Sequence, residues 1–81
     1  MMTQHELLQS IQPILHAYDY EVAKVTDSEL LSRSVEVRGK SHSFGGAFLE
    51  AIGSFCRANF VTWIVMIDGD NLPLISISYS E

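Results

Sequence analysis

Two basic residues and a glycine precede a predicted helix, and this order is typical of sites that hold an anion. Arg38, Gly39 and Lys40 end a predicted strand, and Ser41 and Ser43 follow them. The first N–H groups of a helix have no partner within the helix, and the helix dipole adds partial positive charge there. A phosphate at this position would meet free donors and two full charges. The glycine spacing is not that of a Walker loop.

Two further residues belong to this candidate site. Phe44 is expected at the first position of the helix, where its backbone N–H is free. Arg33 shares a predicted strand face with Val35 and would either extend to solvent from an edge strand or line the same end of the sheet as Arg38. A simpler explanation, which we favour, is that Ser41 or Ser43 caps the helix. The predicted ligand-binding set is Arg33, Arg38, Lys40, Ser41, Ser43 and Phe44.

Other reactive residue types have plainer structural explanations. Cys56 lies on an apolar helical stripe and is expected to be buried and unreactive. His42 has neither an orienting partner nor an oxyanion site in any recognisable motif. Asp68 and Asp70 flank a glycine and offer too few oxygen ligands for a calcium loop. We therefore expect no metal, no cofactor and no enzymatic activity, and an enzyme built around His42 ranks third among the hypotheses.

The composition narrows the possible partners. The chain of 81 residues is expected to form one domain, residues 1–81, and its net charge of −5 argues against nucleic-acid binding. Apolar residues make up 47% of a chain with little interior, so part of the apolar surface is expected to meet a second copy or another protein. A single cysteine and the lack of a long apolar segment predict a cytoplasmic protein without membrane contact.

Six elements are predicted along the chain. A helix spans 4–18, begins with a Thr3–Glu6 capping box, and is either kinked at Pro13 or divided there into two helices. A core helix spans 44–58. The predicted strands span 20–25, 30–38, 61–67 and 72–79.

The last two strands are the clearest. Residues 61–67 are apolar on both faces, which predicts a central, covered strand. A hairpin turn at 68–71 is expected to hold Gly69 at positive φ. Pro73 belongs at an edge or at the first residue of its strand. The large aromatic residues are expected in the core, namely Phe44, Phe48, Phe55, Phe60 and Trp63.

These elements predict an α+β fold in the order α-β-β-α-β-β. The fold is expected to be a two-layer sandwich in which two helices cover a four-stranded, mostly antiparallel sheet. A right-handed crossover that skips the first strand would give the strand order 4-3-1-2. Residues 39–51 resemble small phage-encoded α+β proteins, and the resemblance implies no site residue.

The leading functional hypothesis is a small non-enzymatic binding protein that acts through protein–protein contacts, as a homodimer or as a module that inhibits or regulates a partner. It is motivated by the apolar composition, the mild acidity and the lack of a catalytic motif. The alternative is a binder of a small phosphorylated or nucleotide ligand at the start of the second helix.

Overall fold

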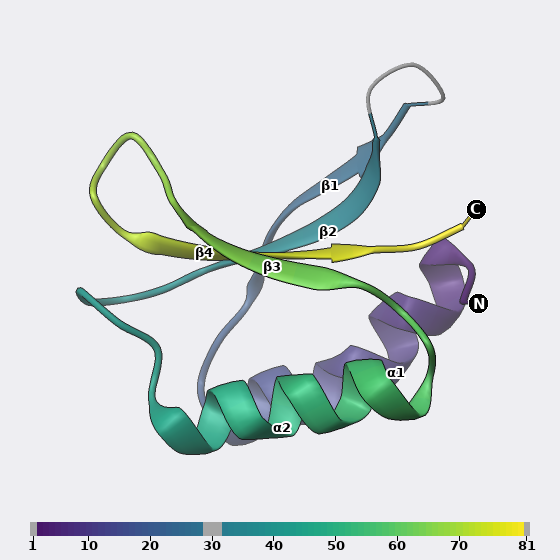
Figure 1. Cartoon of the computed structure of the whole chain (residues 1–81), viewed down its shortest axis with the longest axis horizontal. Coiled ribbons are helices and arrows are strands. Elements are labelled where there is room, and N and C mark those ends of the chain that lie inside the picture. The colour runs from purple at the N-terminus through teal and green to yellow at the C-terminus, as the bar shows by residue number, and fades with distance from the viewer. Residues whose placement is uncertain (1, 29–31, 81) are drawn as a thin grey trace.

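The structure, a computed structural model, describes residues 2–28 and 32–80 and has the predicted order of elements. Helices α1 (Gln4–Ala17) and α2 (Gly46–Ala58) lie side by side and cover one face of the sheet (Figure 1). The strands are β1 (Val22–Asp27), β2 (Arg33–Arg38), β3 (Trp63–Ile67) and β4 (Pro73–Ser78). Each pairs antiparallel with its neighbours, so the predicted α+β sandwich is confirmed. Residues 29–31, which include the predicted start of the second strand, lie outside the described residues.

The start of α1 follows from its capping box. Glu6 N donates to Thr3 Oγ1 at 3.2 Å, and Thr3 N donates to Glu6 Oε1 at 3.0 Å. The helix continues through Pro13, so the alternative of two short helices is wrong. Pro13 is exposed, and burial of the opposite stripe of the helix offsets the missing backbone bond. That buried stripe is Leu7, Ile11 and Leu15.

The second helix begins later than the sequence predicts. Gly45 is its N-cap and supplies no side-chain hydrogen bond, so the expectation of a cap at Ser41 or Ser43 is wrong. The reason is Phe44, which precedes the helix instead of starting it. Its buried ring lies 5.5 Å from the ring of Phe48, so the chain must first carry Phe44 into the core. The buried residues of α2 are Phe48, Ile52, Gly53 and Cys56, which makes it the expected core helix.

The strand order is β1-β2-β4-β3, and the predicted order 4-3-1-2 is therefore wrong. The crossover through α2 skips β4 rather than β1, and β4 pairs with β2 on one side and β3 on the other. The alternating strand β4 is central, since Ile75 and Ile77 are completely buried. The uniformly apolar β3 is an edge strand. Pro73 fits this arrangement as the first residue of β4, where its carbonyl accepts from Gly39 N at 2.7 Å.

The hairpin between β3 and β4 lies where the sequence predicts it, but with a different turn. Asn71 N donates to Asp68 O at 3.1 Å, and Asn71 itself takes a φ of 62°. Gly69 is not at positive φ, so that expectation is wrong. The loop is one residue longer than a two-residue turn, and in such loops the residue after the turn takes the left-handed conformation. Asparagine tolerates that conformation well.

Candidate functional site

Two cations of the predicted anion site line one hollow of about 410 Å³, but each already faces a carboxylate. Arg38 Nε forms an ion pair with Asp68 Oδ2 at 2.8 Å. Lys40 Nζ lies 2.8 Å from Asp19 Oδ2 in a pair exposed to solvent, where ion pairs contribute little. Asp19 and Glu21 thus line the same hollow as the two basic residues, and their negative charges would repel an anion. Its walls are Asp19, Glu21, Val22, Ala23, Arg38, Gly39 and Lys40.

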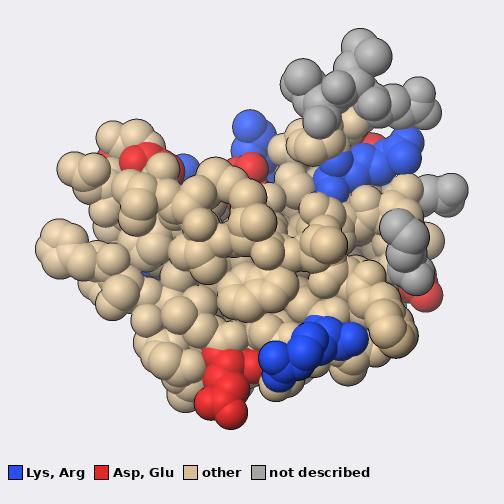
Figure 2. Space-filling view, viewed as in Figure 1, with Lys and Arg blue, Asp and Glu red and all other residues tan. Residues whose placement is uncertain are grey.

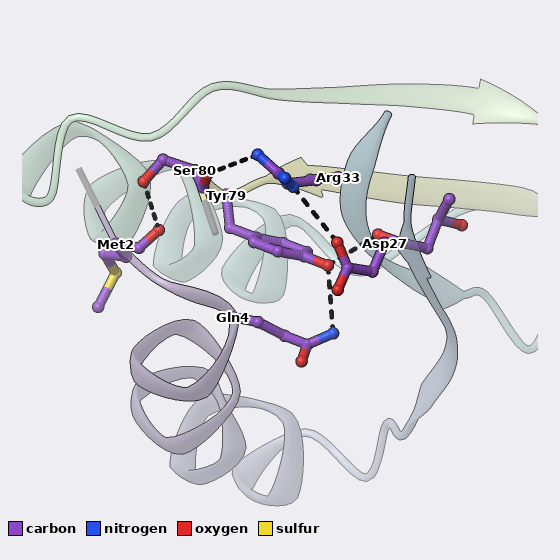
Figure 3. Close-up of polar contacts among 7 residues, drawn as sticks. Met2, Gln4, Asp27, Arg33, Tyr79 and Ser80 are labelled. Carbon is purple, nitrogen blue, oxygen red and sulfur yellow. Dashed lines mark hydrogen bonds and ion pairs between the residues drawn. The ribbon is translucent and has the colours of Figure 1, made fainter. Parts of the chain in front are cut away.

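Arg33 lies at the opposite end of β2 from Arg38, so the expectation that both line the same end of the sheet is wrong. Four strand residues lie between them, so their Cα atoms are roughly 16 Å apart. Arg33 Nη1 donates to Ser80 O at 3.1 Å, and Arg33 Nε lies 3.3 Å from Asp27 Oδ1 (Figure 3). The guanidinium therefore joins the segment after β4 to the end of β1.

Tyr79 extends this group of contacts into the interior. Its hydroxyl donates to Thr26 O at 2.8 Å and accepts from Gln4 Nε2 at 3.1 Å (Figure 3). Ser80 N and Ser80 Oγ both donate to Met2 O, at 3.0 and 3.1 Å. These bonds connect α1, β1 and the segment after β4, so we assign Arg33 and Tyr79 a structural role.

Ser41, Ser43 and Phe44 occupy the loop before α2. Ser41 Oγ donates to Ser43 O at 3.3 Å, and both serines are exposed. The ring of Phe44 is buried and is a core residue. None of the three is among the walls of the hollow that Arg38 and Lys40 line. The six predicted ligand-binding residues therefore occupy three separate places.

Cys56 and Asp68 have structural environments. Burial raises the pKa of the Cys56 thiol to about 11, which keeps the thiol protonated near neutral pH. Asp68 Oδ1 accepts from the N–H groups of Asp70 and Leu72, at 2.8 and 3.1 Å. The Asp70 bond above all, with the Leu72 bond and the Arg38 charge, holds the pKa of Asp68 below its usual range. This carboxylate organises the hairpin turn.

The most unusual surface of the molecule follows β3. Five of the seven large apolar residues that are exposed in the described chain lie within residues 60–67, so the exposure is concentrated in one segment. Figure 2 shows a band without charged side chains across this part of the molecule, with charges above and below it. We call these residues the β3 patch: Phe60, Ile64, Val65, Met66 and Ile67, exposed by 84, 58, 49, 39 and 62%.

The backbone of β3 offers free hydrogen-bonding groups beside the patch. Ser78 N donates to Thr62 O, and Asp68 N donates to Leu72 O, both at 2.9 Å. In an antiparallel pair, residues bonded to the neighbouring strand alternate with residues that face away from it. The even-numbered residues of this segment therefore bond to β4. The N–H and C=O groups of Trp63, Val65 and Ile67 point outward from the sheet edge.

The two edges of the sheet differ in how they are protected. On β1 the register shifts between Val22 and Lys24, and the strand carries the charges of Lys24 and Asp27. Bulges and edge charges discourage another strand from pairing. The register of β3 is continuous, and its five residues, Trp63–Ile67, include no charge and no proline. Only the β3 edge is therefore suited to accept a further strand.

Phe60 stands at the start of this edge in a costly position. Its φ is 55°, a conformation that bulky side chains rarely adopt, and its ring is 84% exposed. The positive φ belongs to the turn that ends α2, in which Phe60 N donates to Arg57 O and Val61 N donates to Cys56 O. Burial does not explain a phenylalanine here. Phe60 therefore adds a large exposed ring to the β3 patch. The expectation that Phe60 is a core aromatic is wrong.

The prediction that residues 61–67 form a central, covered strand is wrong. A strand that is apolar on both faces is usually buried, so this pattern did not indicate the β3 patch. The side chains of Trp63, Val65 and Ile67 face the helix side, and those of Ile64 and Met66 face the open side. The two helices cover one face of the sheet (Figure 1), but residues 64–67 of β3 remain exposed. The alternation of residues 74–79 predicted which face of β4 the helices cover, but not the position of β4 in the sheet.

Comparison of the chain with known protein families, with curated proteins and with solved structures finds no match. Within residues 2–28 and 32–80, no helix is both long and apolar enough to cross a membrane. In the same part of the chain, no group of three or more His, Cys, Asp or Glu could hold a metal ion. The functional argument therefore rests on the geometry of the surface.

Proposed function

We propose that this chain is a small non-enzymatic binding protein that acts through protein–protein contacts made at the β3 edge. The observation that supports the proposal is the unprotected strand Trp63–Ile67, which combines outward backbone groups with exposed apolar side chains on both faces. Each feature alone is common among proteins. Together they match the requirements of binding by strand addition, in which backbone bonds give affinity and alternate side chains give specificity.

Leaving the β3 edge exposed to solvent is unfavourable for a protein that has no partner there. Large apolar side chains that stay in water lose the free energy that their burial would contribute, and an exposed strand edge promotes aggregation. A binding role for the β3 edge explains why β3 lacks the charges that β1 carries.

A matched pair of variants tests the proposal. Val65 and Val25 are both exposed strand valines, at 49 and 38%, but they lie on opposite edges of the sheet. Proteins cross-linked to the tagged wild-type chain in a lysate of its native host should be absent with Val65→Lys and retained with Val25→Lys. Peptide mapping should place their cross-links beside β3. Partners that bind both variants equally would refute the β3 edge as the binding surface.

A small anionic ligand is a second candidate, supported by Arg38 and Lys40, which line the 410 Å³ hollow with their side chains about half exposed. To bind there, a phosphate must displace Asp19 from Lys40. An NMR titration with phosphate and a panel of nucleotides should then shift residues 38–40, and Lys40→Ala should weaken the shift. Unchanged spectra at millimolar ligand would refute this candidate.

A further inference from the structure

We infer that the partner of the β3 edge is a second copy of the same edge, paired antiparallel across a two-fold axis that passes beside Val65. This inference rests on the proposed binding role of β3 and names its occupant. The two four-stranded sheets would then join into one continuous sheet of eight strands.

The outward backbone groups fix which registers are possible. Only Trp63, Val65 and Ile67 present free N–H and C=O groups, so these residues must meet one another in the pair. Opposing Val65 to Val65 of the second copy also opposes Trp63 to Ile67. In this register all five residues of each β3 are paired, and all three outward residues of each copy donate one bond and accept one.

The side chains of the β3 patch complement one another in that register. On the helix side, Val65 meets Val65, and the 62% exposed Ile67 meets Trp63. On the open side, Ile64 meets Met66. Each exposed apolar side chain of β3 thus gains an apolar partner directly across the pair, where cross-strand contacts are strongest. The strand pairs with itself without bringing any charge against its own copy.

The size of the contact sets the expected affinity. Pairing of two five-residue strands buries less than the roughly 800 Å² per partner that is typical of stable complexes. We therefore expect a reversible dimer that dissociates in the micromolar range rather than a permanent one. The measured mass should rise with concentration from 9.1 kDa toward twice that value.

A charge exchange at the two-fold axis tests the pairing. Val65→Lys and Val65→Glu each place two like charges directly opposite one another, about 5.5 Å apart at Cα. Each variant alone should raise the dissociation constant of the dimer at least about tenfold. An equimolar mixture of the two should restore a dimer, because lysine then faces glutamate. Val25→Lys, which adds the same charge to β1, should dimerise like the wild type.

Sedimentation equilibrium of all four chains and of the mixture measures these outcomes, and circular dichroism confirms that each variant is folded. Ile67→Lys, at a more exposed outward position, replaces Val65→Lys if the latter unfolds, and it should also weaken the dimer. Disulfide formation between cysteine variants tests the register of the pair. Val65→Cys should cross-link readily, whereas Ile64→Cys should cross-link poorly because its two copies lie about 7–8 Å apart on a diagonal. Buried Cys56 does not compete.

The results separate the inference from the function on which it rests. A wild-type chain that stays at 9.1 kDa up to several hundred micromolar overturns self-pairing, while a different protein cross-linked to β3 would still support the binding role. A dimer that tolerates Val65→Lys and Ile67→Lys overturns self-pairing at β3, since the contact then lies elsewhere. The binding role itself is overturned only if cross-linked partners bind Val65→Lys and Val25→Lys equally. A dimer lost in each charge variant but not restored in the mixture overturns the register.

Discussion

Replacing Phe60 with glycine should stabilise the folded monomer although it removes a large apolar side chain. At a φ of 55°, a side-chain-bearing residue loses about 1–2 kcal/mol relative to its preferred conformations. Glycine avoids this strain but loses about 0.5–1 kcal/mol of backbone entropy on folding. The ring is 84% exposed, so its removal sacrifices little burial. The free energy of unfolding should therefore rise by about 0.5–1 kcal/mol.

Urea unfolding in the Val65→Lys background measures this change without a contribution from association. Phe60→Ala is the control, because it removes the ring and keeps the strained backbone. Its free energy of unfolding should stay within about 0.5 kcal/mol of the parent. The melting temperature of the glycine variant should rise by roughly 2–8 °C. A glycine variant less stable than the alanine variant would refute the argument, because strain at Phe60 could not then be the dominant effect.

Four other substitutions test the core, the turn and the polar contacts by urea unfolding. Phe48→Ala should cost about 3–5 kcal/mol, because the ring is only 1% exposed, and an unchanged midpoint would contradict the described core. Asn71→Val should lower the free energy of unfolding by about 1–2 kcal/mol, because Asn71 has positive φ. Gly69→Val should leave it nearly unchanged, because Gly69 is not at positive φ and has open space around it, and the reverse ranking would mean that the turn is misplaced. Tyr79→Phe should cost about 1 kcal/mol for its two lost hydrogen bonds, and no loss would show that these bonds contribute nothing net. Asp68→Asn should be less stable than wild type at neutral pH. Because the folded pKa of Asp68 is lowered, its contribution is complete above the usual pKa of 3.8 and is lost as pH falls through the lowered value, so the two stability curves should converge in acid; a constant difference would contradict this.

Local patterns in the sequence predicted local structure well. Thr3 and Glu6 gave the start of α1, because a capping box involves only neighbouring residues. The alternation at Ile75 and Ile77 gave the buried face of β4. These signals need no knowledge of the rest of the fold.

The errors arose where a residue's role depends on distant partners. An apolar strand such as β3 has the same pattern whether a core covers it or a partner does, and only the position of β4 distinguishes the two cases. Arg38 and Lys40 were correctly placed near one another. Their pairing with Asp68 and Asp19 was not predictable, since it requires the tertiary positions of both carboxylates. The start of α2 was misplaced because burial of Phe44 outweighs local capping preference.

The central position of β4 also determines when the sheet can form during folding. β4 follows the other five elements of residues 2–28 and 32–80, yet it lies between β2 and β3 and is the strand that joins them. Until it is in place, the β1–β2 hairpin and β3 share no backbone hydrogen bond, and the core residues Val35 and Val37 lie on a two-stranded sheet, which is marginal in water. A ribosome-bound chain that has emerged only as far as residue 70 therefore exposes an unpaired edge on β2 as well as on β3. Completion of this sheet must wait until β4 is synthesised, and that interval is when these strands are most vulnerable to aggregation.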